Sequence, residues 1–395
     1  MKVRDRIVSW ATLLCFVAGA ALGLIRPDWA GKLSFLGTAY VTVLKYLALP
    51  MLILSVFHAA LLGGKNAAGT LIRALALFVL LFIVTFLLSA LLYTLIAPGR
   101  RFSFVQEVAW EGNRVNVTMA GFLENIFSPS KLTSINSLFF PLILISFVLG
   151  LVCGVLKARF LEKGTAAAMG FFQTLLSWVM LLMPLGVFSL MAQLTSTFGL
   201  EALKTSGAYI LWAYAGCLLA LFAVMILPLW ITCKIDPIQY FQRTGRTLLT
   251  ALSTCSSAVT LPETMRACRE EFGVAERIVG IVTPLGCTVH MCGGAVSFSL
   301  LAFYSYQVMG YNISLGTLLW MLALALLLNM GAPGIPGGGI VLGATYLGMM
   351  GFIHWELFLG MYAGIYRLLD MAYTSLNVAG DVTANLLIDR WEKKR

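Results

Sequence analysis

The first 235 residues of the chain alternate between long apolar runs and short polar segments. The runs have the length needed to cross a bilayer, and the short alternating strands of a membrane barrel are absent. Apolar runs of this length predict transmembrane helices. We expect six spans, over residues 9–25, 34–63, 70–96, 136–156, 165–194 and 207–232. The pattern therefore predicts an all-α polytopic membrane protein.

After residue 235, polar residues and glycines interrupt the apolar segments. The stretch STCSSAVTLPETM, residues 253–265, follows the short apolar piece Leu248–Leu252 and precedes a charged segment that starts at Arg266. Because these pieces are too short to cross a bilayer, we expect a hairpin that enters and turns back, with its second arm beginning near Ser257. Free N–H groups at the start of that arm would suit an anionic group. A polar loop between ordinary helices is the alternative.

A second interruption is NMGAPGIPGGGIV, residues 329–341, between the apolar arms 315–328 and 340–352. Each arm is short of a full span, and the glycines permit tight turning and close backbone approach. An ordinary surface loop is the alternative. Between two such arms, we expect a second hairpin tip that could serve as a mobile gate.

The stretch TVHMCGG, residues 288–294, lies inside the apolar run 278–304. Either small residues surround a hydrogen-bonded histidine, or the helix breaks here to bind something. Cys287, His290 and Cys292 suggest a soft-metal site, but their short spacing offers no complete tetrahedral set.

The last apolar helix carries four polar residues at spacings of 4, 3 and 4: Asp370, Thr374, Asn377 and Asp381. This spacing places them on one helical face. Two carboxylates in a membrane helix are costly unless they pair, bind ions or bind substrate. Pairing with an arginine such as Arg367 is the alternative, but the threonine and asparagine on the same face favour a ligand site.

Composition and charge agree with a membrane protein. The chain is 60% hydrophobic and 11% charged, whereas a soluble domain has about 25% charged residues. Its basic residues fall mostly on one side of six alternating helices, which predicts that this side and both termini are cytoplasmic at the cell inner (plasma) membrane. The net charge of +10 then needs no nucleic-acid partner.

A hairpin followed by a helix occurs twice: the first helix is broken at His290 and the second carries the polar face 370–381. This arrangement is expected for inverted repeats with a binding site at the midplane of a secondary transporter. No GxxxxGK[ST] motif is present, so ATP is not expected to drive it. An intramembrane protease would use Ser257 with His290, or Asp370 with Asp381. No GxSxG-type elbow surrounds the serines, and the aspartates lie about 16 Å apart along one helix. A channel is a third possibility, which two occluding tips disfavour.

At these residues the chain resembles the glutamate transporter family, the dicarboxylate/amino acid:cation symporters. The most specific parts are SSAVTLPETM, PLGCTVHMCGG, GIPGGG and DMAYTSLNVAGD. The resemblance implies a cation-coupled symporter of an amino acid, without an enzymatic activity or cofactor, driven by Na⁺, H⁺ or both. It also implies eight transmembrane helices with two re-entrant hairpins, a homotrimer in membrane lipid, and elevator-type movement.

The resemblance divides the chain into two parts. Residues 1–235 would mainly form a scaffold and trimerisation unit, with spans 3 and 6 joining the transport core. Residues 236–395 would form that core, as hairpin 236–272, span 276–305, hairpin 313–350 and span 352–388.

The resemblance also implies roles for individual residues. The substrate would be bound by Ser256, Ser257, Ile335, Gly339, Asp370, Tyr373, Thr374 and Asn377, with Asp370 holding its amino group. The cation-binding residues would be Gly286, Thr288, His290, Met291, Asn329, Ala332, Asn377 and Asp381, of which Gly286, Asn329 and Ala332 would use their backbone.

The chain departs from the family's pattern in one ion site. His290–Gly294 stand where the family typically carries NMDGT, and the polar partners expected on the third span fall on Phe78, Leu81 and Phe82. These side chains cannot ligate a hard cation, which prefers oxygen. His290 could carry a proton instead, because histidine titrates near neutral pH. A neutral imidazole hydrogen-bonded in the core is the alternative.

A second departure concerns the substrate. Members that take acidic substrates carry an arginine where this chain has Tyr373, and Cys255 replaces the arginine that some relatives have at the first tip. Without a guanidinium, a second carboxylate would lack its bidentate partner. We therefore expect a neutral amino acid, with an acidic amino acid or C4-dicarboxylate as the alternative.

Overall fold

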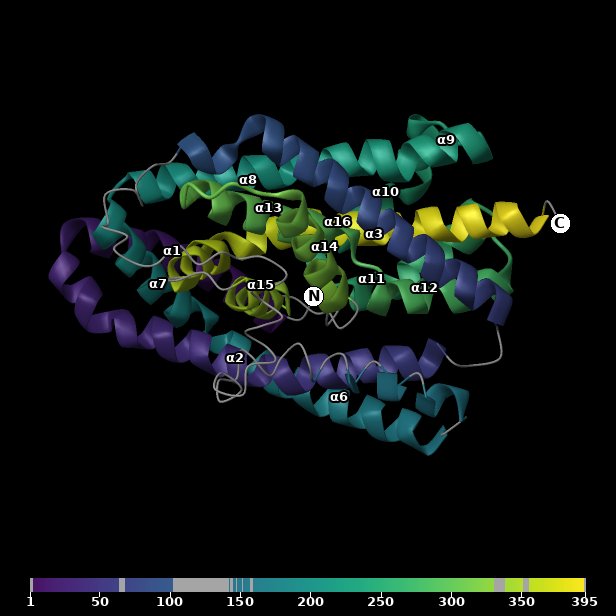
Figure 1. The fold of residues 1–395 in the computed structure, drawn as a ribbon, viewed down its shortest axis with the longest axis horizontal. Helices are drawn as coiled ribbons and strands as arrows, with labels where there is room; N and C mark the ends of the chain where they lie inside the picture. Colours follow the sequence, from purple (N-terminus) through teal and green to yellow (C-terminus); the bar gives the residue numbers. More distant parts are fainter. Residues whose placement is uncertain are drawn as a thin grey trace.

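The computed structural model describes the chain over 3–63, 68–101, 142, 145–146, 148–150, 152–156, 159–329, 338–350 and 355–393. In these residues the secondary structure is helical, without strands (Figure 1). The α-helices are α1 (Val3–Ile25), α2 (Pro27–Gly63), α3 (Ala68–Ile96), α6 (Arg159–Val179), α7 (Met183–Phe198), α8 (Glu201–Ala220), α9 (Leu227–Cys233), α10 (Pro237–Thr254), α11 (Ser257–Arg266), α12 (Glu276–Val289), α13 (Cys292–Val308), α14 (Leu315–Asn329), α15 (Gly338–Met349) and α16 (Trp355–Lys393). The predicted all-α class is confirmed.

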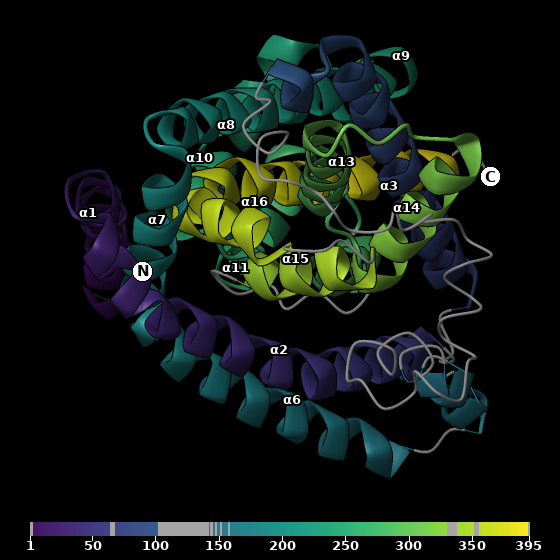
Figure 2. The same ribbon diagram turned by 60° about the vertical axis from the view of Figure 1, so that its left-hand side comes forward.

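The helices pack in two groups. In the first, α1 and α2 pack against α7, and α6 lies along α2, which Figure 2 shows as an arm set apart from the other helices. In the second, α16 lies at the centre and contacts α8, α10, α12, α13 and α15, while α3 packs against α13. The groups meet mainly where α7 and α1 touch α16 and where α2 touches α15.

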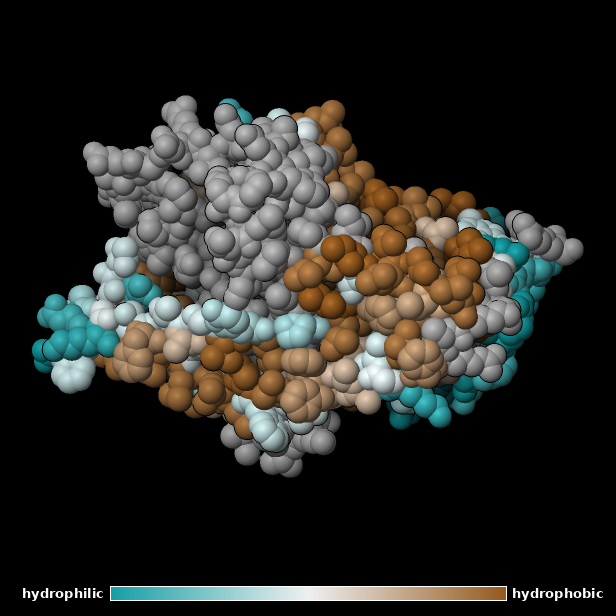
Figure 3. Space-filling view, turned by 60° about the horizontal axis from the view of Figure 1, so that its bottom comes forward, coloured by the Kyte–Doolittle hydropathy of each residue, from teal (hydrophilic) through white to brown (hydrophobic). Residues whose placement is uncertain are grey.

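Three helical stretches of the described chain are long and apolar enough to cross a membrane: Gly69–Ile96, Leu203–Cys233 and Glu276–Val308. Large apolar side chains such as Leu95, Leu211 and Ile231 are exposed on the surface, and apolar residues gather over a broad area of the face in Figure 3. Exposed apolar surface of this extent requires an apolar environment, which a bilayer provides.

Most of the six expected early spans coincide with helices. The span predicted at 70–96 is α3, and that at 207–232 is formed by α8, a π-helical turn at Leu221–Ile226 and α9. The span predicted at 34–63 begins earlier, at Pro27. The single helix expected over 165–194 is wrong in detail: a 3₁₀ turn at Met180–Leu182 separates α6 from α7. Pro184 lies in the first turn of α7, where its missing N–H costs nothing. The span expected at 136–156 lies partly outside the described residues.

The sequence of the α10–α11 pair explains its sharp turn. Asp236 caps α10 by accepting a hydrogen bond from the N–H of Gln239 at 2.8 Å. At the other end, Cys255 has a φ of 50°, a left-handed conformation that stops the helix. Ser256 then caps α11, its hydroxyl accepting from the N–H of Val259 at 3.3 Å. The second arm thus begins at Ser257, as predicted.

The apolar stretch Glu276–Val308 is broken between α12 and α13. His290 and Met291 have extended backbone angles there, with φ values of −110° and −122°. This confirms the helix break predicted within TVHMCGG. The arms α14 and α15 also contact each other, and the predicted tip between them, including Ala332 and Ile335, lies outside the described residues.

Candidate functional site

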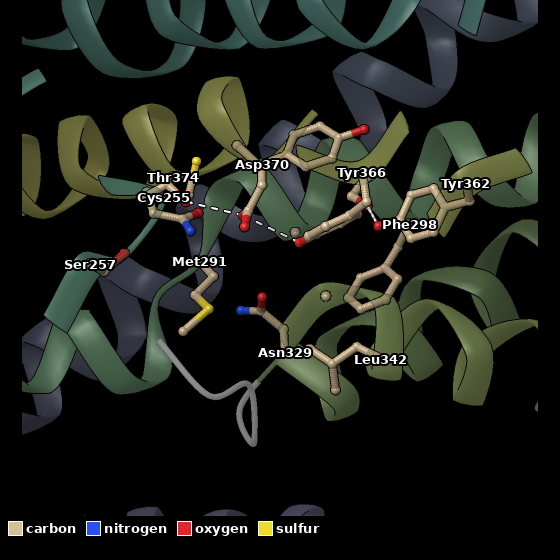
Figure 4. A pocket seen from close by; sticks show the side chains of 15 residues that line it. Cys255, Ser257, Met291, Phe298, Asn329, Leu342, Tyr362, Tyr366, Asp370 and Thr374 are labelled. Atoms are coloured by element: carbon tan, nitrogen blue, oxygen red, sulfur yellow. Dashed lines mark hydrogen bonds between the residues drawn. The ribbon is translucent and has the colours of Figure 1, made fainter. Parts of the chain in front are cut away.

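A cavity of about 50 Å³ lies where α11, the start of α13, the facing ends of α14 and α15, and α16 converge (Figure 4). Among its lining residues are Ser257, Met291, Asn329, Gly339, Asp370 and Thr374. These come from the four segments in which the sequence predicted a binding site. The fold therefore brings together the helical pairs α10–α11 and α14–α15, the break between α12 and α13, and the polar face of α16.

Asp370 is the one carboxylate among the described residues that line this cavity. It is 7% exposed, and its Oδ1 accepts hydrogen bonds from Tyr366 at 3.3 Å and Thr374 at 3.2 Å. Both donors lie one turn away on α16, so the helix itself holds the carboxylate in place. None of the described lining residues is Lys, Arg or His. A buried carboxylate in this setting favours a ligand that brings positive charge or N–H donors.

Two tyrosines near Asp370 were missed by the sequence reasoning. Tyr366 packs its hydroxyl against Gly339 of α15, so closely that a Cβ on that glycine would collide with it. Tyr362 shares a hydrogen bond with Ser297 of α13 at 2.7 Å. Both precede Asp370 at helical spacing, which is the signal that could have found them.

Asn377 and Tyr373 hold α16 against the break between α12 and α13. Asn377 Oδ1 accepts a hydrogen bond from the N–H of Gly293 at 2.7 Å, which satisfies a free donor in the first turn of α13. The missing side chain of Gly293 leaves room for the backbone of Tyr373. Tyr373 lines the cavity and is buried.

His290 lies outside this cavity, in a buried cluster of its own. Its Nδ1 is 3.1 Å from Asp381 Oδ1 and its Nε2 is 2.9 Å from the Cys292 thiol. A neutral imidazole has one N–H donor and one acceptor nitrogen, so it can serve both contacts. His290 is thus hydrogen-bonded within the core.

Aromatic and glycine neighbours complete the cluster. The ring of His290 stacks on Phe78 of α3, with centroids 4.5 Å apart and planes at 14°. A Cβ on Gly380 would collide with the imidazole, and one on Gly286 would collide with Asp381. The sequence reasoning had counted Phe78 into this neighbourhood, and the structure places it there.

The contacts in the series Cys292, His290, Asp381 match those of a nucleophile, base and acid, but a substrate could not reach these side chains. Cys292 is 0% exposed, and neither it nor His290 lines the cavity. The protease alternatives are not assembled either, because Ser257 and Asp370 line the cavity whereas His290 and Asp381 do not. In the described residues, no group of three His, Cys, Asp or Glu side chains could hold a metal ion.

Of the other predicted residues, Asn329 lines the cavity, whereas Ser256 and Thr288 do not. Ser256 caps α11. The Thr288 side chain is exposed, and its hydroxyl donates to Leu285 O on its own helix at 2.9 Å. Asn329 donates through Nδ2 to Val289 O at 3.3 Å.

The pattern of the sodium:dicarboxylate symporter family matches residues 8–391. The chain belongs to this family. This confirms the resemblance that the four motifs carried, and it means that the protein is a cation-coupled transporter and not an enzyme.

Individual relatives agree with the family. A Caenorhabditis elegans protein named for sodium-dependent excitatory amino acid transport is 32% identical over 271 residues, which are 66% of this chain and 53% of that protein. The chain thus matches about half the length of that relative. The proton/sodium-glutamate symport protein of Bacillus caldotenax is 27% identical over 98% of this chain and 94% of its own. A C4-dicarboxylate transport protein of Anaeromyxobacter sp. (strain K) is 26% identical over 99% of this chain and 91% of its own.

These names bear on the predicted substrate. They are the names of transporters of excitatory amino acids, glutamate or C4-dicarboxylates. They support the acidic alternative better than the neutral amino acid that the sequence reasoning preferred.

Proposed function

We propose that this symporter moves an amino acid across the membrane and that Asp370 binds its ammonium group. The observation that carries the proposal is a buried carboxylate facing a cavity whose described lining is free of basic side chains. An ammonium group would bring positive charge and N–H donors to this buried carboxylate. The start of α11, with Ser257 at its first turn, suits the substrate's α-carboxylate.

Two substrate classes remain, and different observations favour them. The names of the relatives make acidic amino acids the first candidates. The absence of a lining arginine in the described part of the cavity makes a neutral amino acid the second, because a buried side-chain carboxylate needs a charged partner.

The coupling ion is Na⁺, H⁺ or both in this proposal. Asn377 and Asp381, with the backbone of Gly286, would form one cation site, yet Asn377 Oδ1, Asp381 Oδ1 and Gly286 O each already interact with Gly293 or His290. Met291 and Thr288, with the backbone of Asn329 and Ala332, would form the other. Each of these oxygens has a further lone pair, so it could ligate a sodium ion while it keeps its hydrogen bond.

The packing of the helices supports a moving core. The group α1, α2, α6 and α7 would be the scaffold of a homotrimer. The group around α16, with α3 and α8, would move relative to this scaffold and carry the bound substrate across the membrane, as in an elevator-type transporter. The pairs α10–α11 and α14–α15 would be re-entrant hairpins that close over the cavity, in a protein of the inner (plasma) membrane with both termini in the cytoplasm.

Uptake into proteoliposomes tests the proposal. Vesicles with an inward Na⁺ gradient, an inward H⁺ gradient or neither would be offered radiolabelled L-aspartate, L-glutamate, succinate, L-serine and L-alanine. We expect concentrative uptake of at least one amino acid that collapses when the driving gradient is removed. Uptake of succinate alone would contradict the role of Asp370, and gradient-independent equilibration would contradict symport.

A further inference from the structure

Asn329 is the last residue of α14 and points its side chain into the cavity (Figure 4). It is 2% exposed. Its Nδ2 donates to Val289 O at 3.3 Å, whereas its Oδ1 has no hydrogen-bond partner in the described part of the chain. Leaving such a buried carbonyl oxygen without a hydrogen bond is energetically costly, so a ligand that donates to it would be stabilised.

The orientation of the amide follows from its neighbour. Turning the amide over would place Oδ1 against the carbonyl of Val289, where two acceptors would repel each other. The contact with Val289 therefore directs Nδ2 to the backbone and Oδ1 to the cavity.

Gly294 provides the space in which this oxygen lies. A Cβ on Gly294 would be 2.7 Å from Asn329 Oδ1, so any other residue there would push the amide away. Gly294 is in the first turn of α13, beside the break at Met291. The position of Asn329 Oδ1 thus depends on the same broken helix that shapes the cavity.

Across the cavity from Asn329 lies Asp370, and the two side chains point toward one another in Figure 4. Asp370 Oδ1 already accepts hydrogen bonds from the hydroxyls of Tyr366 and Thr374. The two facing groups, a carboxylate and an amide oxygen, are both acceptors. A primary ammonium, which carries three N–H donors on one atom, can satisfy both.

We propose that Asn329 Oδ1 accepts a hydrogen bond from the substrate's ammonium group opposite Asp370, so that Asn329 determines the preference for amino acids over the same carbon skeleton without the amine. This inference rests on the proposed function, because it names a second contact to the substrate that Asp370 binds. Asn329 thereby acts through its side chain, in addition to the backbone role expected for it in a cation site.

Paired substrates test the proposal in proteoliposomes. L-aspartate and succinate differ by one amine, as do L-alanine and propionate. The ratio of transport efficiency (kcat/KM) for the amine over its partner would be measured for the wild type, Asn329→Leu, Asn329→Asp and Asn385→Leu. Asn385 is the matched control: it is 0% exposed and its Oδ1 also has no partner among the described residues, but it does not line the cavity.

We expect Asn329→Leu to lower the ratio at least about ten-fold, equivalent to about 1.4 kcal/mol. Asn329→Asp keeps an acceptor and should retain the preference for the amine. Asn385→Leu should leave the ratio within about two-fold, even if it lowers both efficiencies by weakening the fold.

Two results would overturn the inference: an unchanged ratio in Asn329→Leu, whether or not both efficiencies fall, or a raised Na⁺ requirement that is the same for both members of a pair. The last result would make the side chain a cation ligand. Each variant would first be compared with the wild type by size-exclusion chromatography. If Asn329→Leu does not fold, the ratio of Asn329→Asp against that of Gly294→Ala, which displaces the amide, decides the question. A wild type that transports no amino acid defeats the proposed function itself, whereas a wild type that transports amino acids with an insensitive ratio defeats only the role of Asn329.

Discussion

The imidazole of His290 lies 3.1 Å from the carboxylate of Asp381 and joins the break in one transmembrane stretch to the middle of α16. Phe78 covers one face of the ring, and Gly380 lies against it. The side chains of this cluster occupy the region where the family's pattern had suggested oxygen ligands for an ion. Its tight fit leads to a prediction about α16.

Gly380→Ala should destabilise the protein, because the new Cβ would collide with the His290 ring and force it away from Asp381 and Phe78. Overpacking of this kind costs about 1–3 kcal/mol. The measurement is the thermal midpoint of the purified protein in detergent. Gly245→Ala in α10 is the control, since nothing lies within 4 Å of its added Cβ, and it should be neutral or slightly stabilising. Equal midpoints for the two variants would contradict the close packing of His290.

Gly339→Ala should weaken substrate binding without contacting the substrate's ammonium. The added methyl group would displace the hydroxyl of Tyr366, which donates to Asp370 at 3.3 Å. We expect an increase in KM of about ten-fold, the effect of one lost hydrogen bond to a charged group. Tyr366→Phe removes that hydroxyl and its hydrogen bond altogether, so adding Gly339→Ala to Tyr366→Phe should cause little further loss. Strictly additive effects in this double-mutant cycle would show that the two residues are not coupled.

Asp370→Asn should abolish most amino acid uptake, because a neutral amide cannot offer the charge that an ammonium group needs. The expected loss in kcat/KM is about 10- to 100-fold. Asp389→Asn serves as the control: Asp389 lies near the end of the same helix, where it accepts from the N–H of Ala275 at 3.2 Å and pairs with Lys393. If both variants lost uptake equally, the effect would reflect α16 as a whole and not the cavity.

The sequence predicted which segments meet at the cavity better than it predicted the bounds of the surrounding helices. Asp370, Thr374 and Asn377 share a face because helical spacing requires it, and Ser256 and Cys255 mark the turn between α10 and α11 through local capping chemistry. The contacts of Tyr366 with Gly339 and of His290 with Gly380 were not predictable, because they join residues of different helices whose mutual placement depends on packing. Likewise, the division between α6 and α7 depends on a single turn near Pro184 inside an otherwise apolar run.

Glu392→Gln should loosen the ends of three helices at once. Glu392, near the end of α16, accepts from Thr70 at 2.6 Å and pairs with Arg73 of α3 at 3.3 Å, and it also pairs with Arg277 of α12. Its side chain is 18% exposed, so the pairs are partly shielded from solvent. We expect a lower thermal midpoint, consistent with a loss of about 1–3 kcal/mol for a hydrogen-bonded charge that serves several partners.

The control for this network is Glu201→Gln, which breaks the pair with Lys204 on the surface of α8. The side chains of that pair are 50% and 66% exposed, and an exposed pair contributes about 0–1 kcal/mol. High salt should reduce the difference between wild type and Glu392→Gln, since screening weakens the charge pairs that the wild type alone possesses. A midpoint for Glu392→Gln that matches Glu201→Gln would show that the ends of α3, α12 and α16 are held together by apolar packing alone.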